Sequence, residues 1–234
     1  MDPPITGPIT ARRWLLLTLR DSLSCYFVMG STNCTDDPRK VLRDALSSGV
    51  TMFQFREKGE NCLTGTEAVN LAADLHAICK EHKVPYIVND NIDLALEIEA
   101  DGVHIGQEDG DAEEIRKRMG SSKILGISAH SLTEANAAIK AGADYLGVGP
   151  MYPTMTKNDT RPVSGPILIE ELKTYGIQLP IVGIGGINAN NAAEVLHAGA
   201  DGVAVISCLS SSRDPKSSVR NLITVIQEAR KIIL

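Results

Sequence analysis

Short apolar segments alternate with longer amphipathic segments along most of the chain, and this alternation constrains the fold more than any other feature. Eight short segments have the length and apolar character of buried strands: residues 25–29, 51–55, 86–89, 103–105, 124–127, 144–148, 180–183 and 202–206. Strands that alternate with helices form a parallel sheet, and eight such units close a barrel. We therefore predict an α/β protein with a single-domain (β/α)8 TIM barrel; a doubly wound open sheet is the alternative.

The segments between these strands carry helix start and stop signals. Asp37 precedes Pro38 as an N-cap precedes a proline in the first helical turn. Thr64, followed three residues later by Glu67, has the spacing of a capping box. The predicted helices cover about residues 37–49, 64–81, 92–98, 111–120, 131–142, 164–174, 190–197 and 215–232.

An Ala-Asp pair recurs directly before three of the predicted strands, at Asp101, Asp144 and Asp201. Each pair marks a helix-to-strand turn, so we expect all three at the floor of the barrel, the end opposite the carboxyl ends of the strands. No linker interrupts residues 24–234, which we assign to one barrel domain. Residues 1–23 form an N-terminal arm followed by a helix over 11–23, which we expect to close one end of the barrel.

The composition excludes several classes of function. The formal net charge of −6 and an aromatic content of 4% argue against nucleic-acid binding. No apolar run approaches the ~18 residues of a membrane span, and the apolar run after Arg12-Arg13 is too short for a signal peptide. The five cysteines include no Cys-x-x-Cys pair, which favours reduced thiols and a cytoplasmic protein.

The segment 149–157 combines residues that end regular secondary structure with hydrogen-bond donors. Gly149, Pro150 and Pro153 end the preceding strand, and Thr154, Met155, Thr156 and Lys157 follow within the same loop. Two hydroxyls, one ammonium and the nearby amides, with no carboxylate, suit an anion such as a phosphate. The alternative is a polar surface turn with a solvated lysine.

A second basic cluster follows the strand at 51–55. Gln54, Arg56 and Lys58 alternate along the chain, so they point to one side of the strand. Two neighbouring cations repel each other unless an anion lies between them, which again predicts a phosphate ligand. The alternative is a charged strand end in solvent, with Glu57 as its counterion.

Carboxylates follow the next two strands. Asn89 and Asp90 come after one strand and Asp109 comes after the other. Two carboxylates suit Mg²⁺, which keeps water ligands and takes others from substrate phosphates. The alternatives are an N-cap role for Asp90 and simple surface exposure for Asp109.

The remaining strand ends complete the predicted mouth. Ser128 and His130 follow the fifth strand, and a structural role for this histidine is as well supported as a general base. The glycine-rich run 183–188 and the pair Ile206-Ser207 follow the last two strands, where barrels commonly bind phosphate. Two anion sites and one Mg²⁺ site indicate two phosphorylated small-molecule substrates.

Seven motifs in this order resemble the thiamine-phosphate synthase family. They are Tyr26-Phe27-Val28-Met29-Gly30-Ser31, Gln54-Phe55-Arg56-Glu57-Lys58, Val88-Asn89-Asp90, the run 104–109, the run 126–130, the run 149–157 and Gly183-Ile184-Gly185-Gly186-Ile187. The resemblance covers about residues 24–232 and leaves residues 1–20 without a role. A homo-oligomer is left open.

The resemblance implies a Mg²⁺-dependent transferase that joins 4-amino-2-methyl-5-hydroxymethylpyrimidine diphosphate to hydroxyethylthiazole phosphate and releases diphosphate. It assigns to the pyrimidine diphosphate Gln54, Phe55, Arg56, Glu57, Lys58, Asn89, Ser128 and Lys157. It assigns to the thiazole phosphate Thr154, Met155, Thr156, Gly186, Ile206 and Ser207, and to Mg²⁺ Asp90 and Asp109. Lys157, Arg56 and Lys58 would be the catalytic cations.

Two other functions are weighed against this one. A thiazole tautomerase on the same fold would use His130 for proton transfer, but it would not need both basic clusters. A non-catalytic sensor would bind both phosphates without releasing diphosphate.

Overall fold

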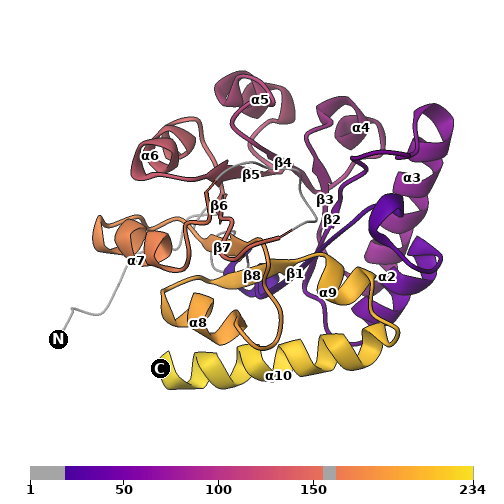
Figure 1. The fold of residues 1–234 in the computed structure, drawn as a ribbon. Helices are drawn as coiled ribbons and strands as arrows, with labels where there is room; N and C mark the ends of the chain where they lie inside the picture. The colour runs from indigo at the N-terminus through magenta and orange to yellow at the C-terminus, as the bar shows by residue number, and fades with distance from the viewer. Residues whose placement is uncertain (1–18, 155–161, 234) are drawn as a thin grey trace, which may run out of the picture.

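Eight parallel strands pair in sequence order, and the last strand pairs with the first to close a barrel (Figure 1). The computed structural model describes residues 19–154 and 162–233. The strands are β1 (Cys25–Met29), β2 (Met52–Phe55), β3 (Tyr86–Asn89), β4 (Gly102–Ile105), β5 (Ile124–Ala129), β6 (Tyr145–Val148), β7 (Ile181–Ile184) and β8 (Gly202–Val205). The predicted (β/α)8 barrel is confirmed, and the doubly wound sheet is excluded by the β1–β8 pairing.

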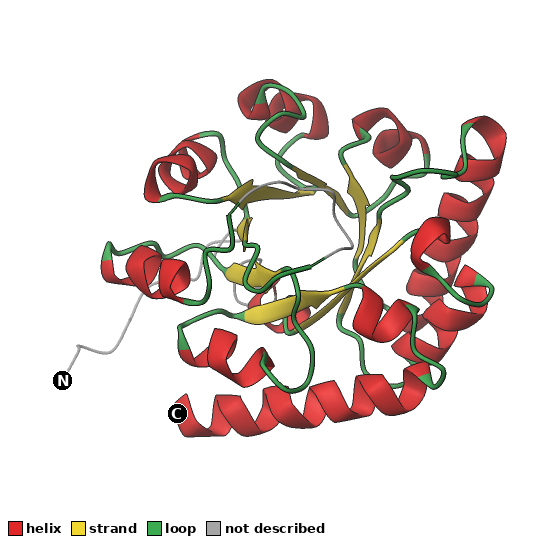
Figure 2. Cartoon of the chain, viewed as in Figure 1, coloured by secondary structure: helices red, strands yellow, loops and turns green. Residues whose placement is uncertain are grey.

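Helices surround the barrel on the outside (Figure 2). They are α2 (Pro38–Leu46), α3 (Gly65–His82), α4 (Ile92–Glu97), α5 (Ala112–Met119), α6 (Leu132–Lys140), α7 (Ile167–Thr174), α8 (Ala192–His197), α9 (Ser207–Ser210) and α10 (Pro215–Ile233), with a 3-10 turn η1 (Ser31–Asn33) after β1. The long α10 packs against α8 and α2 (Figure 1). The sequence predicted neither η1 nor α9.

The helix caps confirm some of the predicted signals and correct others. Asp37 caps α2 by accepting the backbone N–H of Arg39, as predicted. Thr64 precedes α3 but its side chain makes no capping hydrogen bond, so the predicted capping box is wrong at this helix. The cap of α4 is Asn91, which accepts the N–H of Leu94, and this leaves Asp90 available for another role.

Strand side chains alternate between two apolar cores, because successive residues of a strand point to opposite faces. Phe27 and Phe53 pack outward under the helices, whereas Tyr26 and Met52 fill the barrel interior. The interior cluster also contains Leu19 and Leu23, both buried, from the described end of the N-terminal segment. Residues 19–22 are helical, so this part of the predicted helix does close the floor.

A repeated clamp holds the floor together. Each clamp joins a residue just before an even-numbered strand to a residue near the start of the preceding strand. The first residue donates its backbone N–H to the carbonyl of the second at 2.7 to 3.0 Å, and its side-chain oxygen accepts the backbone N–H of the second at 2.8 to 2.9 Å. The four pairs are Thr51 with Cys25, Asp101 with Tyr86, Asp144 with Leu125 and Asp201 with Ile181. Three of the four clamps fall at the Ala-Asp repeat, so the repeat marks where two neighbouring strands are joined at the floor of the barrel.

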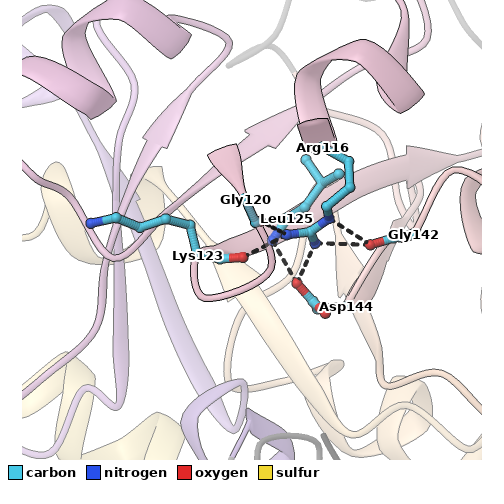
Figure 3. Close-up of polar contacts among 6 residues, drawn as sticks. All are labelled: Arg116, Gly120, Lys123, Leu125, Gly142 and Asp144. Atoms are coloured by element: carbon cyan, nitrogen blue, oxygen red, sulfur yellow. Dashed lines mark hydrogen bonds and ion pairs between the residues drawn. The ribbon is translucent and has the colours of Figure 1, made fainter. Parts of the chain in front are cut away.

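One of these clamps carries a buried ion pair (Figure 3). Arg116 of α5 reaches Asp144 at 2.5 Å, and its other N–H groups donate to the carbonyls of Gly142, Gly120 and Lys123. The side chains of Arg116 and Asp144 are 17% and 8% exposed. Because the guanidinium also satisfies three backbone carbonyls, it fixes α5 to the loops that lead into β5 and β6.

Candidate active site

A cavity of about 380 Å³ opens at the carboxyl ends of the strands. Its lining includes four residues that the sequence predicted, Arg56, Lys58, Asn89 and Ser128, together with the carboxylate pair Asp90 and Asp109. These residues lie at or just after the carboxyl ends of β2, β3, β4 and β5, as expected for the mouth of a parallel barrel. The structure thus brings the predicted cations and carboxylates together around one space.

Three predicted ligands in β2 or just after it lie elsewhere. Phe55 packs in the outer core, so its side chain cannot reach the mouth. Glu57 accepts the backbone N–H of Ser31 at 2.8 Å and that of Leu63 at 2.9 Å. This carboxylate therefore joins the loops after β1 and β2, and among the described residues it lines neither cavity at the mouth. Gln54 is buried in the barrel interior beneath the mouth, where it bonds to Tyr26.

Both carboxylates lie near the end of the Lys58 side chain, which is 47% exposed. The Lys58 ammonium contacts Asp90 Oδ2 and lies 3.8 Å from Asp109 Oδ1. Asp90 Oδ2 is buried, and among the described residues it receives no hydrogen bond of good geometry. Burial, opposed by Lys58 and aided by Asp109, raises the pKa of Asp90 above its ordinary value.

Asp109 has the opposite shift. Burial opposes ionisation, but hydrogen bonds with Asp90 and the Gly106 N–H, together with the charge of Lys58, hold the pKa of Asp109 below its ordinary value. Asp90 itself adopts a left-handed backbone with φ of 59°, which costs energy for a non-glycine residue. The backbone strain and the opposed pKa values of adjacent carboxyls are typical of a functional site.

A second cavity, of about 510 Å³, adjoins the first and shares Thr154, Ile184 and Gly185 with it. Its lining also contains the predicted residues Gly186, Ile206 and Ser207. None of the described residues that line it is charged, and Gly185 and Gly186 expose backbone on its wall. Such a surface lets amides approach an anion closely.

The loops after β6 and β7 cross at close range between the two cavities. Met151 N–H donates to the Ile184 carbonyl at 2.9 Å, and Tyr152 N–H donates to Gly185 at 3.0 Å. Gly186 has φ of +67°, and a Cβ there would lie 2.7 Å from the Pro153 carbonyl. The glycines after β7 are therefore required by contact as well as by conformation.

Met155, Thr156 and Lys157 lie outside the described residues, so the structure gives no position for these three predicted ligands. His130 lines the first cavity, and its Nδ1 lies 2.5 Å from the Gly149 carbonyl. Since that carbonyl can only accept, Nδ1 carries a proton and anchors the loop after β6. This contact favours the structural role that the sequence left open for His130.

His104 was not predicted as a site residue, but it lines the first cavity and touches Ser128. Nor were Tyr26 and Tyr145, which connect His104 to Gln54 inside the barrel. All three are polar residues on strands with otherwise apolar interior positions. That polarity within a buried strand was the signal that could have identified them.

Comparisons with known proteins decide the family. The sequence model described as thiamine monophosphate synthase matches residues 25–209, which is more than half of the chain. The chain belongs to this family. The matched range contains the whole mouth of the barrel, including both cavities.

Individual relatives agree with this assignment. The thiamine-phosphate synthase of a Bacillus cereus strain is 53% identical over 206 residues, which cover 88% of this chain and 92% of that protein. The thiamine-phosphate synthase of Bacillus mycoides is 54% identical over 200 residues, 86% of this chain and 91% of that protein. Among solved structures, thiamine phosphate pyrophosphorylase from Pyrococcus furiosus superposes with a TM-score of 0.80 at 33% identity, covering 90% of this chain and 98% of its own.

Proposed function

We propose that this enzyme condenses 4-amino-2-methyl-5-hydroxymethylpyrimidine diphosphate with hydroxyethylthiazole phosphate, giving thiamine phosphate and diphosphate. Membership of the thiamine monophosphate synthase family supports the reaction. The observation that carries the proposal is a pair of adjoining cavities with different chemistry. One contains two cations, the pair Asp90 and Asp109 and a third carboxylate, Glu108, whereas the described lining of the other is uncharged and contains the hydroxyls of Thr154 and Ser207.

The division of the mouth fits two phosphorylated substrates. Arg56 and Lys58 are placed for the diphosphate in the first cavity, with Asn89 and Ser128 beside them. Gly186, Ile206 and Ser207 are placed for the single phosphate in the second cavity. Thr154 lies on the shared wall, where the two reacting atoms would meet.

Asp90 and Asp109 fit a divalent cation. Asp90 Oδ2 is buried against the Lys58 ammonium, and Asp109 Oδ1 lies 3.8 Å from the same ammonium. Among residues 19–154 and 162–233, no group of three or more His, Cys, Asp or Glu side chains is arranged to hold a metal. The two carboxylates would therefore share Mg²⁺ with water and with the diphosphate. A bound Mg²⁺ would neutralise charge on the departing diphosphate.

The residues of the chain supply positioning and positive charge. The aminopyrimidine donates electrons toward its exocyclic carbon, so the bond to diphosphate can break before the new bond forms. Arg56 and Lys58 stabilise the charge that develops on the leaving oxygen. The attacking thiazole nitrogen carries no proton, so the step needs no general base. This agrees with the engagement of His130 Nδ1 at the Gly149 carbonyl.

The reaction takes place on small molecules, and we propose that it occurs in the cytoplasm. All five cysteines are free, which fits a reducing compartment. Among the described residues, no helix has both the length and the apolar character that crossing a membrane requires.

The test measures diphosphate release and thiamine phosphate formation with both substrates and Mg²⁺ present, and with each omitted in turn. We expect product only when all three are present. Binding of both ligands without release would favour the sensor. Isomerisation of a thiazole phosphate precursor, lost in His130→Ala, would favour the tautomerase.

A further inference from the structure

Five polar side chains form a continuous chain of hydrogen bonds through the barrel interior. Gln54 Nε2 lies 2.7 Å from the Tyr26 hydroxyl, which lies 2.9 Å from the Tyr145 hydroxyl. Tyr145 lies 2.9 Å from His104 Nδ1, and His104 Nε2 lies 2.9 Å from Ser128 Oγ. These residues belong to β2, β1, β6, β4 and β5, so the chain crosses the barrel and ends at the cavity.

The barrel interior is shaped to hold this chain. Tyr26 and Tyr145 are at most 1% exposed, and their rings meet edge to face at 6.0 Å. His104 lies against Tyr145 with ring centroids 5.4 Å apart. A Cβ on Gly126 would overlap the Tyr145 ring, and a Cβ on Gly147 would lie 2.8 Å from the His104 ring. The two glycines thus provide the space that the histidine and tyrosine occupy.

The direction of the chain follows from counting protons. The Gln54 amide donates to Tyr26, so the single Tyr26 proton goes to the Tyr145 oxygen. The Tyr145 proton then goes to His104 Nδ1, since burial keeps the pKa of Tyr145 high and its hydroxyl protonated. A neutral His104 carries its own proton on Nε2 and donates it to Ser128 Oγ.

We propose that this chain fixes the Ser128 hydroxyl as a hydrogen-bond donor toward the cavity, and that it thereby selects a pyrimidine whose ring nitrogen is an acceptor. His104 is a positioning residue that acts through Ser128. The identity of the ligand rests on the proposed function, whereas the direction of the chain does not.

The consequence is discrimination between aminopyrimidines and oxopyrimidines. A 4-aminopyrimidine has an unprotonated ring nitrogen next to the amino-bearing carbon, but the 4-oxo compound formed by deamination carries an N–H there. The Ser128 proton then has no acceptor on the ligand and keeps the cost of desolvation, even if the second lone pair of Oγ turns toward that N–H. Sites built around a buried hydrogen bond reject a mismatched ligand by large factors, and we expect at least about 100-fold here.

The first test reads the tautomer of His104 directly. Nitrogen-15 NMR of the histidine-labelled protein, without substrate, separates Nδ1–H, Nε2–H and doubly protonated rings. The protein has five histidines, and His104→Asn identifies the signal. We expect Nε2–H in the wild type and a mixture of tautomers in Tyr145→Phe. A ring with Nδ1–H would overturn the proposal, as would a doubly protonated ring.

The second test measures the dissociation constants of the amino and oxo pyrimidine diphosphates by calorimetry. We expect the preference for the amino compound to fall below about tenfold in Ser128→Ala and in Tyr145→Phe. Tyr86→Phe is the matched control, because its buried hydroxyl donates to the Ala72 carbonyl and belongs to no part of the chain. An undiminished preference in Tyr145→Phe would overturn the proposal.

Failure of the proposed function has a different signature. If neither pyrimidine binds the wild type, the assigned substrate is wrong, and the NMR result alone decides the direction of the chain. If Tyr145→Phe does not fold, Gln54→Met removes the donor at the far end and carries the same expectations in both tests.

Discussion

The Lys58 ammonium contacts the Asp90 carboxylate, at the place where two carboxylates would hold a metal ion. Lys58 is therefore the counterion of the pair in the free protein. A divalent cation would take over that role and release Lys58 toward the diphosphate. In the proposed mechanism, metal binding and the presentation of a cation to the leaving group would thus be coupled through one side chain.

Lys58→Met should separate these two roles. Turnover should fall at least tens-fold, because a charge that faces the leaving group is lost. The affinity for Mn²⁺ without substrate should rise about fivefold, because the competing cation is gone. Lys140→Met, at an exposed position in the last turn of α6, is the control and should change neither quantity. Weaker metal binding in Lys58→Met would contradict this account of the ion pair.

Gly186→Ala should impair binding in the second cavity. The new Cβ would lie 2.7 Å from the Pro153 carbonyl and 2.8 Å from Tyr152, in the loop that carries Thr154. We expect the KM for the thiazole phosphate to rise at least about tenfold, with a smaller change for the pyrimidine diphosphate.

The control for this substitution is Gly176→Ala. Gly176 also has a positive φ, of +85°, but open space surrounds its Cβ position. It therefore tests backbone strain without the contact. Equal effects of the two substitutions on KM would show that strain alone is responsible.

Arg116→Met should destabilise the barrel. The substitution leaves the Asp144 carboxylate buried without its cation and removes donors from three backbone carbonyls. We expect the free energy of unfolding in urea to fall by about 2–4 kcal/mol. Arg118 lies on the same helix as Arg116 and makes an exposed pair with Asp93 of α4, so Arg118→Met should cost about 0–1 kcal/mol. Similar losses for both variants would contradict a special role for the buried pair.

His76 should contribute to loss of stability in acid. Burial, with the charge of Lys80, lowers the pKa of His76 in the folded protein. The unfolded chain binds the proton more readily, so stability is complete above the ordinary pKa of about 6.5 and is lost as pH falls toward the lowered value.

His76→Phe keeps a ring against Tyr86, which His76 meets at 4.9 Å, and removes the titrating group. Urea unfolding between neutral and acid pH should show a weaker pH dependence in this variant, by up to about one proton. If the free energy of unfolding depends on pH equally in His76→Phe and the wild type, His76 does not contribute to the loss of stability in acid.

The barrel could be predicted from sequence because strand-like runs and helix caps are local signals. The mouth could also be predicted, since residues that follow parallel strands must meet at one end. Arg56, Asp90 and Asp109 meet there for that reason. The short α9 could not be predicted, because four residues carry no periodic pattern.

Contacts across the barrel could not be predicted from local signals. Tyr26 and Tyr145 meet because β1 and β6 face each other across a closed barrel, and their separation depends on its radius and register. The contacts of Glu57 also depend on the tertiary structure and could not be predicted. Its position in the motif indicated a substrate contact, but the loop after β1 supplies Ser31, whose N–H the carboxylate accepts.

Binding of Mn²⁺, followed by electron paramagnetic resonance with diphosphate present, tests the central claim most directly. The account predicts that Asp90→Asn and Asp109→Asn each lose metal binding and thiamine phosphate formation together, whereas Asp93→Asn, at an exposed carboxylate, retains both. Unchanged Mn²⁺ binding in the two variants would contradict the account, because the metal of the reaction would then lie elsewhere.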